Sequence, residues 1–373
     1  MASGSRPTLA WPLALALSCV VVYASLYPFS PWRDQGLWSL SFLSAPWPRY
    51  WSGFDVAVNI LGYAPLGFLL ALSVMRGPGW RWPVGLATLA ASMLSLLMEA
   101  LQGYLPLRVP SNVDFALNSL GAWLGALAAA LLEHWGVLQR WSAFRRRWFV
   151  AQARGALVLL ALWPAALLFP ASVPFGLGQV LQRAEDALFE SLAGTPFIEW
   201  MPLRDVELQP LLPGAVAVCV ALGVLVPVLL AYAVVRERWQ RLAALLGTLV
   251  LGVASTALSS ALSFGPDHAW AWLDASARLG LALGLLGAVV ALLLTARAAI
   301  TLTLLVLAVQ LTLLNQAPID PYFEQTRQVW EQGRFVRFNG LTQWLGWSWP
   351  FAALSYVLLR LSGRPTRVDT GSL

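Results

Sequence analysis

The sequence is poor in charged residues and contains no lysine. Charged residues make up 11% and hydrophobic residues 58% of its 373 residues, whereas about a quarter of an ordinary soluble protein is charged. Apolar runs of about 20 residues recur, and each is long enough to cross a bilayer. The composition therefore excludes a soluble globular protein and predicts a polytopic membrane protein. All 24 basic residues are arginines that flank the apolar runs, so we expect no basic face and no nucleic-acid partner.

Cysteine and histidine are also scarce. Cys19 and Cys219 lie in separate apolar segments, a pattern that excludes a disulfide framework and a metal-binding spacing. The topology below places His134 and His268 on opposite sides of the membrane, so they cannot build one site. We therefore predict neither a cofactor nor a metal.

The apolar segments predict an all-α fold, a membrane bundle of about ten transmembrane helices. The predicted spans are 10–27, 56–75, 83–104, 112–133, 155–175, 212–235, 241–263, 277–296, 298–315 and 341–361. The first four spans form one predicted membrane domain, residues 1–150. The later six form a second membrane region, residues 151–373.

The distribution of arginine predicts the orientation. If the N-terminus lies inside, 15 of the 24 arginines fall in inside segments, as the preference of cytoplasmic loops for arginine requires. We expect both termini inside. Two outside loops, 177–193 and 321–332, have amphipathic patterns that predict helices at the membrane surface. Helices that cap the bundle fit these two patterns equally well.

One eleven-residue pattern occurs twice, at 52–62 and 111–121. The two copies share Ser, Asp, Ala, Asn, Leu and Gly at an offset of 59 residues. The polar matches carry the most weight, because hydrocarbon penalises such residues; they are Ser52/Ser111, Asp55/Asp114 and Asn59/Asn118. The pattern predicts a duplicated helical hairpin with a polar site.

On this topology, polar residues from three consecutive spans converge at the outer membrane face. The candidate ligand-binding residues are Asp55, Asn59, Glu99, Gln102, Arg108, Asp114 and Asn118. Ser52-x-x-Asp55 and Ser111-x-x-Asp114 also resemble capping boxes, in which the serine caps the helix and the acid lies at the third helical position. The two asparagines fit hydrogen bonds between helices. Glu99 is harder to explain structurally, because it lies well inside its helix; Arg108 is a candidate partner. Structural and functional roles both stay open.

Small residues predict where helices pack closely. The motifs are Gly121-x-x-x-Gly125 and Gly280-x-x-x-Gly284. A serine stripe, Ser255, Ser259 and Ser263, follows one face of the span 241–263, and we interpret it as a packing face.

The segment from Asp55 to Gly125 resembles the VanZ family of membrane proteins. The matching motifs are Asp55, Asn59, Pro65-Leu66-Gly67-Phe68, Glu99-x-x-Gln102, Arg108 and Asp114-x-x-x-Asn118-x-x-Gly121-x-x-x-Gly125, with Tyr27-Pro28-Phe29 at the end of the first span. The resemblance covers residues 10–135. It implies a bacterial inner-membrane protein of the cell envelope, and it links the chain to a family whose founding member is associated with low-level teicoplanin resistance.

Three functions compete. The first is a non-enzymatic protein whose outward polar pocket binds an envelope lipid or a lipid-linked glycan headgroup. The second is a membrane enzyme acting on a lipid-linked substrate, with Glu99 and Asp114 as general acid and base. The third is a transporter, since same-orientation repeats occur in transporters. A scaffold that binds envelope-assembly proteins is the plainer alternative to all three.

Overall fold

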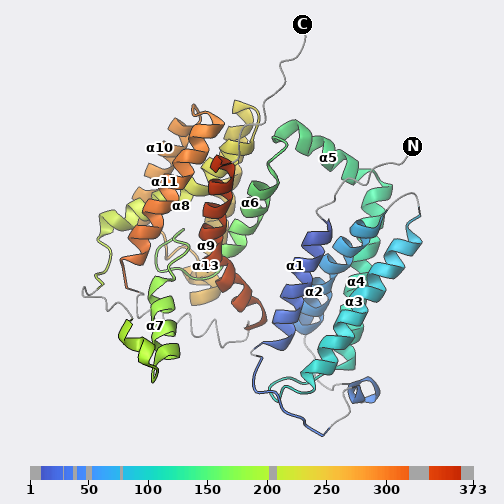
Figure 1. The fold of residues 1–373 in the computed structure, drawn as a ribbon. Helices are drawn as coiled ribbons and strands as arrows, with labels where there is room; N and C mark the ends of the chain where they lie inside the picture. Colours follow the sequence, from blue (N-terminus) through green and yellow to red (C-terminus); the bar gives the residue numbers. More distant parts are fainter. Residues whose placement is uncertain are drawn as a thin grey trace. The chain divides into compact units, whose positions relative to one another are not determined.

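A computed structural model describes residues 10–27, 29–36, 40–47, 53–75, 79–200, 208–318 and 336–362 (Figure 1). Within these ranges the chain forms 12 α-helices and no β-strand, so the predicted all-α class is confirmed. The chain divides into two compact units, residues 1–144 and 145–373. We describe each unit by itself.

Four helices build the first unit (Figure 1). They are α1 (Ala10–Leu26), α2 (Gly53–Val74), α3 (Arg81–Gln102) and α4 (Asn112–His134), with a short 3-10 turn η1 (Ser41–Ser44) before α2. Each helix begins and ends within three residues of its predicted span.

Helices α2 and α4 approach each other so closely that their backbones touch. Gly121 lies against the backbone of Ile60, and Gly125 lies against the backbone of Ala64. From the first contact to the second, both helices advance by four residues toward their C-termini. The helices therefore run in the same direction, as a duplicated hairpin requires. The predicted packing role of Gly121 and Gly125 is confirmed. From the other side, Gly67 lies against the backbone of Ala122.

A helix that the sequence analysis did not predict follows α4. Helix α5 (Val137–Trp148) has no buried residue and carries Arg145, Arg146 and Arg147 in its last turn. The residue where the two units divide lies within it. Its rings of Trp141 and Phe144 stack at 5.5 Å. The many arginines favoured a loop at residues 137–148. Their spacing nevertheless leaves the aromatic side chains together on one face of the helix.

The second unit is arranged around α8 (Pro213–Val234). This helix packs against α6 (Arg154–Ala166), α9 (Arg238–Phe264), α10 (Ala275–Ala291) and α11 (Ala296–Asn315). Most of its residues are buried, as expected of a helix that is apolar on all sides. Gly280 and Gly284 of α10 pack on α8, which confirms the second predicted small-residue motif.

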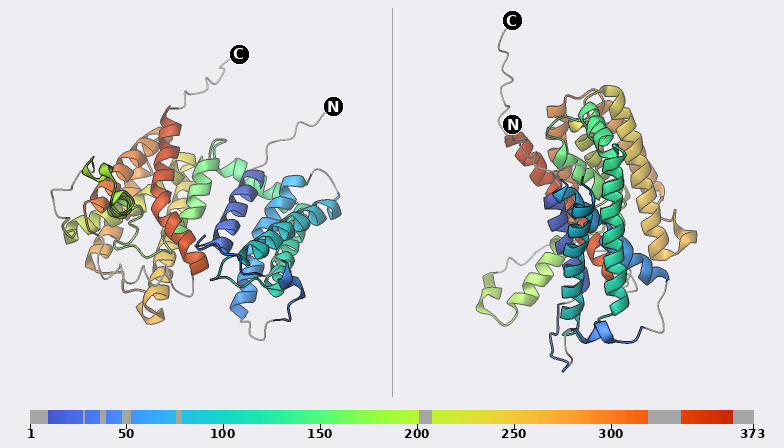
Figure 2. Two further views of the ribbon diagram at one scale, coloured as in Figure 1. Left: turned by 60° about the horizontal axis from the view of Figure 1, so that its bottom comes forward. Right: turned by 90° about the vertical axis from the view of Figure 1, so that its right-hand side faces the viewer.

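The last described helix of this unit in chain order is α13 (Val336–Ser362), which packs on α6 and α11 (Figure 2). Trp349 of α13 donates its indole N–H to the Leu159 carbonyl at 2.8 Å. The remaining elements are α7 (Leu181–Leu192), η2 (Pro196–Trp200) and η3 (Pro266–His268).

The predicted span 155–175 is wrong in its second half. Helix α6 ends at Ala166, because Pro170 has no N–H to donate to the Ala166 carbonyl and its ring would clash there. Residues 167–180, the α6–α7 segment, continue without helix until α7. Phe169, Phe175 and other side chains of this segment are nevertheless buried.

Helix α11 provides hydrogen bonds to the buried backbone of the α6–α7 segment. Gln310 donates to the Phe175 carbonyl at 3.1 Å. Asn315 donates to the Gly178 carbonyl at 3.0 Å and accepts from the Val180 N–H at 3.0 Å. Non-helical backbone at membrane depth is tolerated where protein partners satisfy it or where it lines a cavity.

The predicted surface helix 177–193 is only partly correct. Helix α7 begins at Leu181, so Leu177 is buried in the α6–α7 segment and does not belong to a helical stripe. The other predicted surface helix, 321–332, lies outside the described residues.

Six of the described helices are long and apolar enough to cross a membrane, namely Asp55–Val74, Arg81–Gln102, Asn112–His134, Pro213–Val234, Arg238–Phe264 and Ala296–Asn315. Three apolar helices are shorter: Ala10–Leu26, Arg154–Ala166 and Ala275–Ala291. The chain is a helical, multi-pass membrane protein.

Candidate functional site

The predicted site residues gather at one end of the first unit, where α1 and α3 end and α2 and α4 begin. Asn59, Glu99, Gln102 and Asn118 are buried there. Asp55 is exposed, one helical turn before Asn59 on α2. Together with three neighbours described below, Tyr63, Ser95 and Ser111, the seven predicted residues form what we call the polar cluster.

One side chain from each copy of the repeat joins α2 to α4. Asn59 Nδ2 donates to Asp114 Oδ1 at 2.9 Å. The equivalent residue of the second copy, Asn118, instead donates to Ser95 Oγ of α3 at 3.0 Å. The two halves of the repeat therefore play different parts, although their sequences match.

Glu99 is bound at the N-terminus of α4. Its Oε2 accepts the backbone N–H of Ser111 at 2.8 Å. Ser111 is the N-cap of α4, and its Oγ accepts from the Asp114 N–H at 3.3 Å. The predicted capping role of Ser111 is confirmed. The positive end of the α4 dipole stabilises a negative charge at this place, which explains how a carboxylate can be buried here. The equivalent Ser52 of the first repeat lies outside the described residues.

Two further residues bind the C-terminal end of α1. Gln102 Nε2 donates to the Ser25 carbonyl at 3.0 Å. Arg108 donates from Nε and Nη2 to the Tyr27 carbonyl at 3.2 and 2.6 Å, and from Nη2 to the Ala24 carbonyl at 3.4 Å. A cation is favoured at the C-terminus of a helix. Arg108 therefore anchors α1, a role that the sequence analysis did not foresee; the predicted pairing of Arg108 with Glu99 stays a prediction.

Ser95 and Tyr63 belong to the cluster but were not among the residues predicted from the sequence. Ser95 is fully buried one turn before Glu99 on the same face of α3, so the spacing 95, 99, 102 was a usable signal. Tyr63 lies beside Ser95 and Glu99 and is 5% exposed. Among the described residues, Tyr63 Oη and Asn118 Oδ1 have no hydrogen-bond partner.

The cluster combines three carboxylates, three amides, three hydroxyls and a guanidinium. Such a set can donate to and accept from a polar headgroup. In the described part of the chain no three His, Cys, Asp or Glu side chains are grouped so that they could hold a metal ion.

Comparison with known protein families tests the resemblance of this unit to the VanZ family. Residues 11–133 match the VanZ/LLP1 family model. This VanZ-like segment contains α1 to α4 and every residue of the polar cluster, so the predicted family resemblance is confirmed for this part of the chain. No curated protein and no solved structure matches the chain. The helices from α6 onward lie outside the VanZ-like segment.

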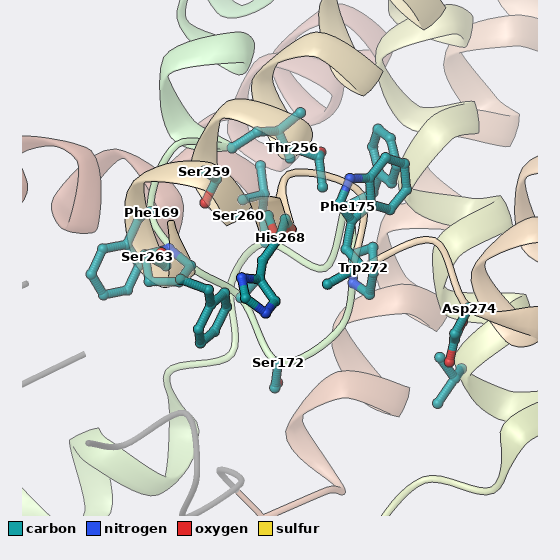
Figure 3. Close-up of a pocket in the computed structure, with 18 residues that line it drawn as sticks. Phe169, Ser172, Phe175, Thr256, Ser259, Ser260, Ser263, His268, Trp272 and Asp274 are labelled. Carbon is teal, nitrogen blue, oxygen red and sulfur yellow. The ribbon is translucent and has the colours of Figure 1, made fainter. Parts of the chain in front are cut away.

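The serine stripe of the second unit lies partly beside a cavity. Ser259 and Ser263 line this cavity together with Thr256 and Ser260 (Figure 3). Ser255 is not among the cavity-lining residues.

Proposed function

We propose that the VanZ-like segment binds the headgroup of an envelope lipid or a lipid-linked glycan in its polar cluster. The protein would lie in the bacterial inner membrane, with ten spans, both termini inside and the cluster facing outward. The distribution of arginine supports this orientation. Candidate partners are therefore membrane lipids, lipid-linked glycans and envelope-assembly proteins.

The observation that carries the proposal is the presence of buried, unpartnered polar atoms beside a buried carboxylate. Tyr63 Oη and Asn118 Oδ1 have no partner among the described residues and lie in the same cluster as Glu99. An unpaired buried polar group costs about 1–3 kcal/mol. A ligand hydroxyl could recover that free energy by bonding to either atom.

The composition of the cluster indicates the class of headgroup. Carboxylate and amide oxygens accept from sugar hydroxyls, and amide N–H groups donate to them. Arg108 can bind a phosphate, because guanidinium–phosphate hydrogen bonds are strong and directional. Release of Arg108 from the α1 carbonyls would then accompany phosphate binding, since the same N–H groups serve both partners.

Binding of a lipid-linked disaccharide diphosphate to the full chain in phosphatidylcholine nanodiscs tests the proposal. We expect Glu99→Ala and Asn118→Leu to weaken binding about tenfold, the loss of one charge-assisted hydrogen bond. Glu133→Gln is the matched control, because Glu133 lies at the other end of α4 and bonds to Gln139. Equal binding by all variants would refute the proposal.

Glu99→Gln separates binding from acid–base catalysis. Glutamine keeps the acceptor oxygen for the Ser111 N–H but cannot transfer a proton. A binding site retains part of its affinity in this variant, whereas a catalytic acid or base loses its activity.

The link to teicoplanin can be tested in cells. Deletion of the gene should raise teicoplanin susceptibility, and Glu133→Gln should restore the wild-type level. Glu99→Ala should not restore it although the protein is made in normal amounts. An unchanged susceptibility after deletion would remove the antibiotic from the proposal and leave headgroup binding to the nanodisc test.

Thiol labelling tests the orientation. In a background with Cys19→Ser and Cys219→Ala, the exposed Asp55→Cys should react with an impermeant maleimide in intact cells. Ser142→Cys on α5 should react only after the membrane is permeabilised. The reverse pattern would overturn the predicted orientation.

A further inference from the structure

The second unit contains a cavity of about 660 Å³ (Figure 3). Its walls are formed by residues between 167 and 177, between 256 and 264 and between 268 and 274, with Val216 of α8. The volume is within the range of small-molecule sites, about 300–1,000 Å³. The non-helical α6–α7 segment forms one wall, and interrupted helices at membrane depth are typical of places where a protein lines a cavity.

Hydrogen-bonding groups in the wall are only partly used by the protein. Ser259 Oγ donates to the Leu168 carbonyl at 2.8 Å, and Ser260 Oγ donates to the His268 carbonyl at 2.7 Å. Three other buried atoms have no partner among the described residues: Thr256 Oγ1, Ser263 Oγ and Trp272 Nε1. Unpaired polar atoms are costly to bury, so a ligand that bonds to them gains affinity.

The rest of the wall is apolar and includes four aromatic side chains. Phe169, Phe175, Phe264 and Trp272 contribute rings, and the described lining residues include no arginine. The one carboxylate, Asp274, is the N-cap of α10, where its Oδ1 accepts the Ala277 N–H at 2.7 Å. Such a wall offers no guanidinium for a phosphate, and its one carboxylate is already bonded to a helix N-terminus.

Figure 3 shows how the polar groups are distributed. His268 lies near the middle of the cavity wall, with Ser172 on one side of it and Ser259 and Ser260 on the other. Trp272 lies to the side of His268. Polar groups thus come from three directions.

We propose that this cavity binds an uncharged glycosyl ring, either as a free sugar or as the headgroup of a glycolipid. A pyranose has a C–H face that packs on aromatic rings and a rim of hydroxyls that both donate and accept. Thr256, Ser263 and Trp272 would bind that rim. The site lies outside the VanZ-like segment and differs in chemistry from the polar cluster, because it has no guanidinium.

Native mass spectrometry of the full chain in phosphatidylcholine nanodiscs tests this site. The probes are methyl β-glucoside, monoglucosyl diacylglycerol, diacylglycerol and phosphatidylglycerol. We expect binding of at least one of the two glucosyl probes and weaker binding of the other two lipids. Preference for the glucosyl lipid over methyl β-glucoside identifies a glycolipid, and equal binding identifies a free sugar.

Variants locate the binding. Thr256→Val keeps the shape of the wall, and Trp272→Phe keeps an aromatic ring in a smaller side chain. Each removes one polar group and should weaken glucosyl binding about fivefold. Thr248→Val is the matched control on α9, because the Thr248 hydroxyl donates to the Ala244 carbonyl of its own helix and is not among the lining residues. A structural role alone would change the melting temperature of Thr256→Val without changing its affinity.

Two outcomes would overturn the assignment. One is that neither glucosyl probe binds; the other is that phosphatidylglycerol or diacylglycerol binds as tightly as the glucosyl lipid. Glu133→Gln serves as a further control, because Glu133 lies outside both proposed sites and this variant should leave glucosyl binding unchanged. Weaker glucosyl binding in Thr256→Val or Trp272→Phe, with unchanged binding of the lipid-linked disaccharide diphosphate, distinguishes this site from the polar cluster.

Discussion

Glu99 in the first unit and Thr256 in the second are both buried polar residues of membrane helices, but their surroundings differ. Glu99 accepts a backbone N–H at the start of α4 and belongs to a cluster with two other carboxylates and Arg108. Thr256 faces a wall of hydroxyls and aromatic rings, and its Oγ1 has no partner among the described residues. The first unit therefore gathers charge, and the second gathers uncharged polar groups around a cavity.

Each unit also uses one arginine in the same way. Arg108 binds the last carbonyls of α1, and Arg241 of α9 donates to the Leu292 and Leu294 carbonyls at 3.0 and 2.6 Å, just after α10. Both arginines satisfy carbonyls that a helix end leaves unpaired. The comparison shows that an arginine bound to the carbonyls of a helix end in this chain is not by itself evidence of a ligand site.

The largest expected effect concerns the contact that holds the first unit together. Gly67→Ala places a methyl group against the backbone of Ala122, which cannot move aside as a side chain could. We expect the free energy of unfolding to fall by about 3 kcal/mol. Amide exchange should rise in residues 53–134 and stay unchanged in 213–315.

Gly62→Ala is the control for this prediction. Gly62 lies in the same helix, and a methyl group there meets no atom within 4 Å. Alanine is the better helix former by about 1 kcal/mol, so this variant should be no less stable than the wild type. Equal destabilisation by both variants would contradict the close α2–α4 contact.

The second effect concerns the buried carboxylate of the first unit. Glu99→Ala leaves the Ser111 N–H without its acceptor, and we expect a loss of about 2 kcal/mol, measured as unfolding in mixed micelles. Glu133→Gln at the opposite end of α4 should cost less than about 0.5 kcal/mol. If Glu99→Ala destabilised the protein as little as Glu133→Gln, the Glu99 carboxylate would not stabilise the N-terminus of α4.

The third effect belongs to the second unit. Asn315→Leu removes the acceptor for the Val180 and Leu181 N–H groups and the donor to the Gly178 carbonyl. We expect about 2 kcal/mol of local destabilisation, seen as faster amide exchange at residues 180 and 181. Thr312→Val is the control, because its hydroxyl bonds only within α11. Unchanged exchange in Asn315→Leu would show that other groups order the α6–α7 segment.

The smallest effect is the coupling between the two repeat copies. A double-mutant cycle with Asn59→Leu and Asp114→Leu should give a coupling free energy of about 0.6 kcal/mol, typical of hydrogen bonds between membrane helices. The cycle Asn118→Leu with Asp55→Leu serves as the comparison, because Asn118 bonds to Ser95. If the second cycle gave the larger coupling, the assigned pairing across the repeat would be incorrect.

Much of the helix pattern could be predicted from the sequence, because long apolar runs leave few alternatives in a membrane. Helices α2, α3 and α4 follow their predicted spans closely, and the glycine motif located their contact. The span 155–175 failed because hydropathy does not distinguish a helix from a buried segment whose backbone is satisfied by side chains of α11. Gln310 and Asn315 supply those bonds from 135 residues further along the chain.

The candidate site was predictable in its membership but not in its bonding. Repeat matching and helical spacing selected Asn59, Glu99 and Asp114, which the structure places at one end of the unit. The sequence pattern could not show that Asn118 donates to Ser95 or that Arg108 binds the end of α1. Both hydrogen bonds depend on how α1 and α3 pack on the repeat.

The three glycines between α2 and α4 also determine which substitutions this protein can accept. Where two backbones touch, any larger residue at position 67, 121 or 125 must push two helices apart, and the displacement would reach Asn59 and Asp114 one or two turns away. In a library that samples every position, we would therefore expect these glycines to tolerate fewer replacements than Gly62 of α2, where an added methyl group meets no atom within 4 Å.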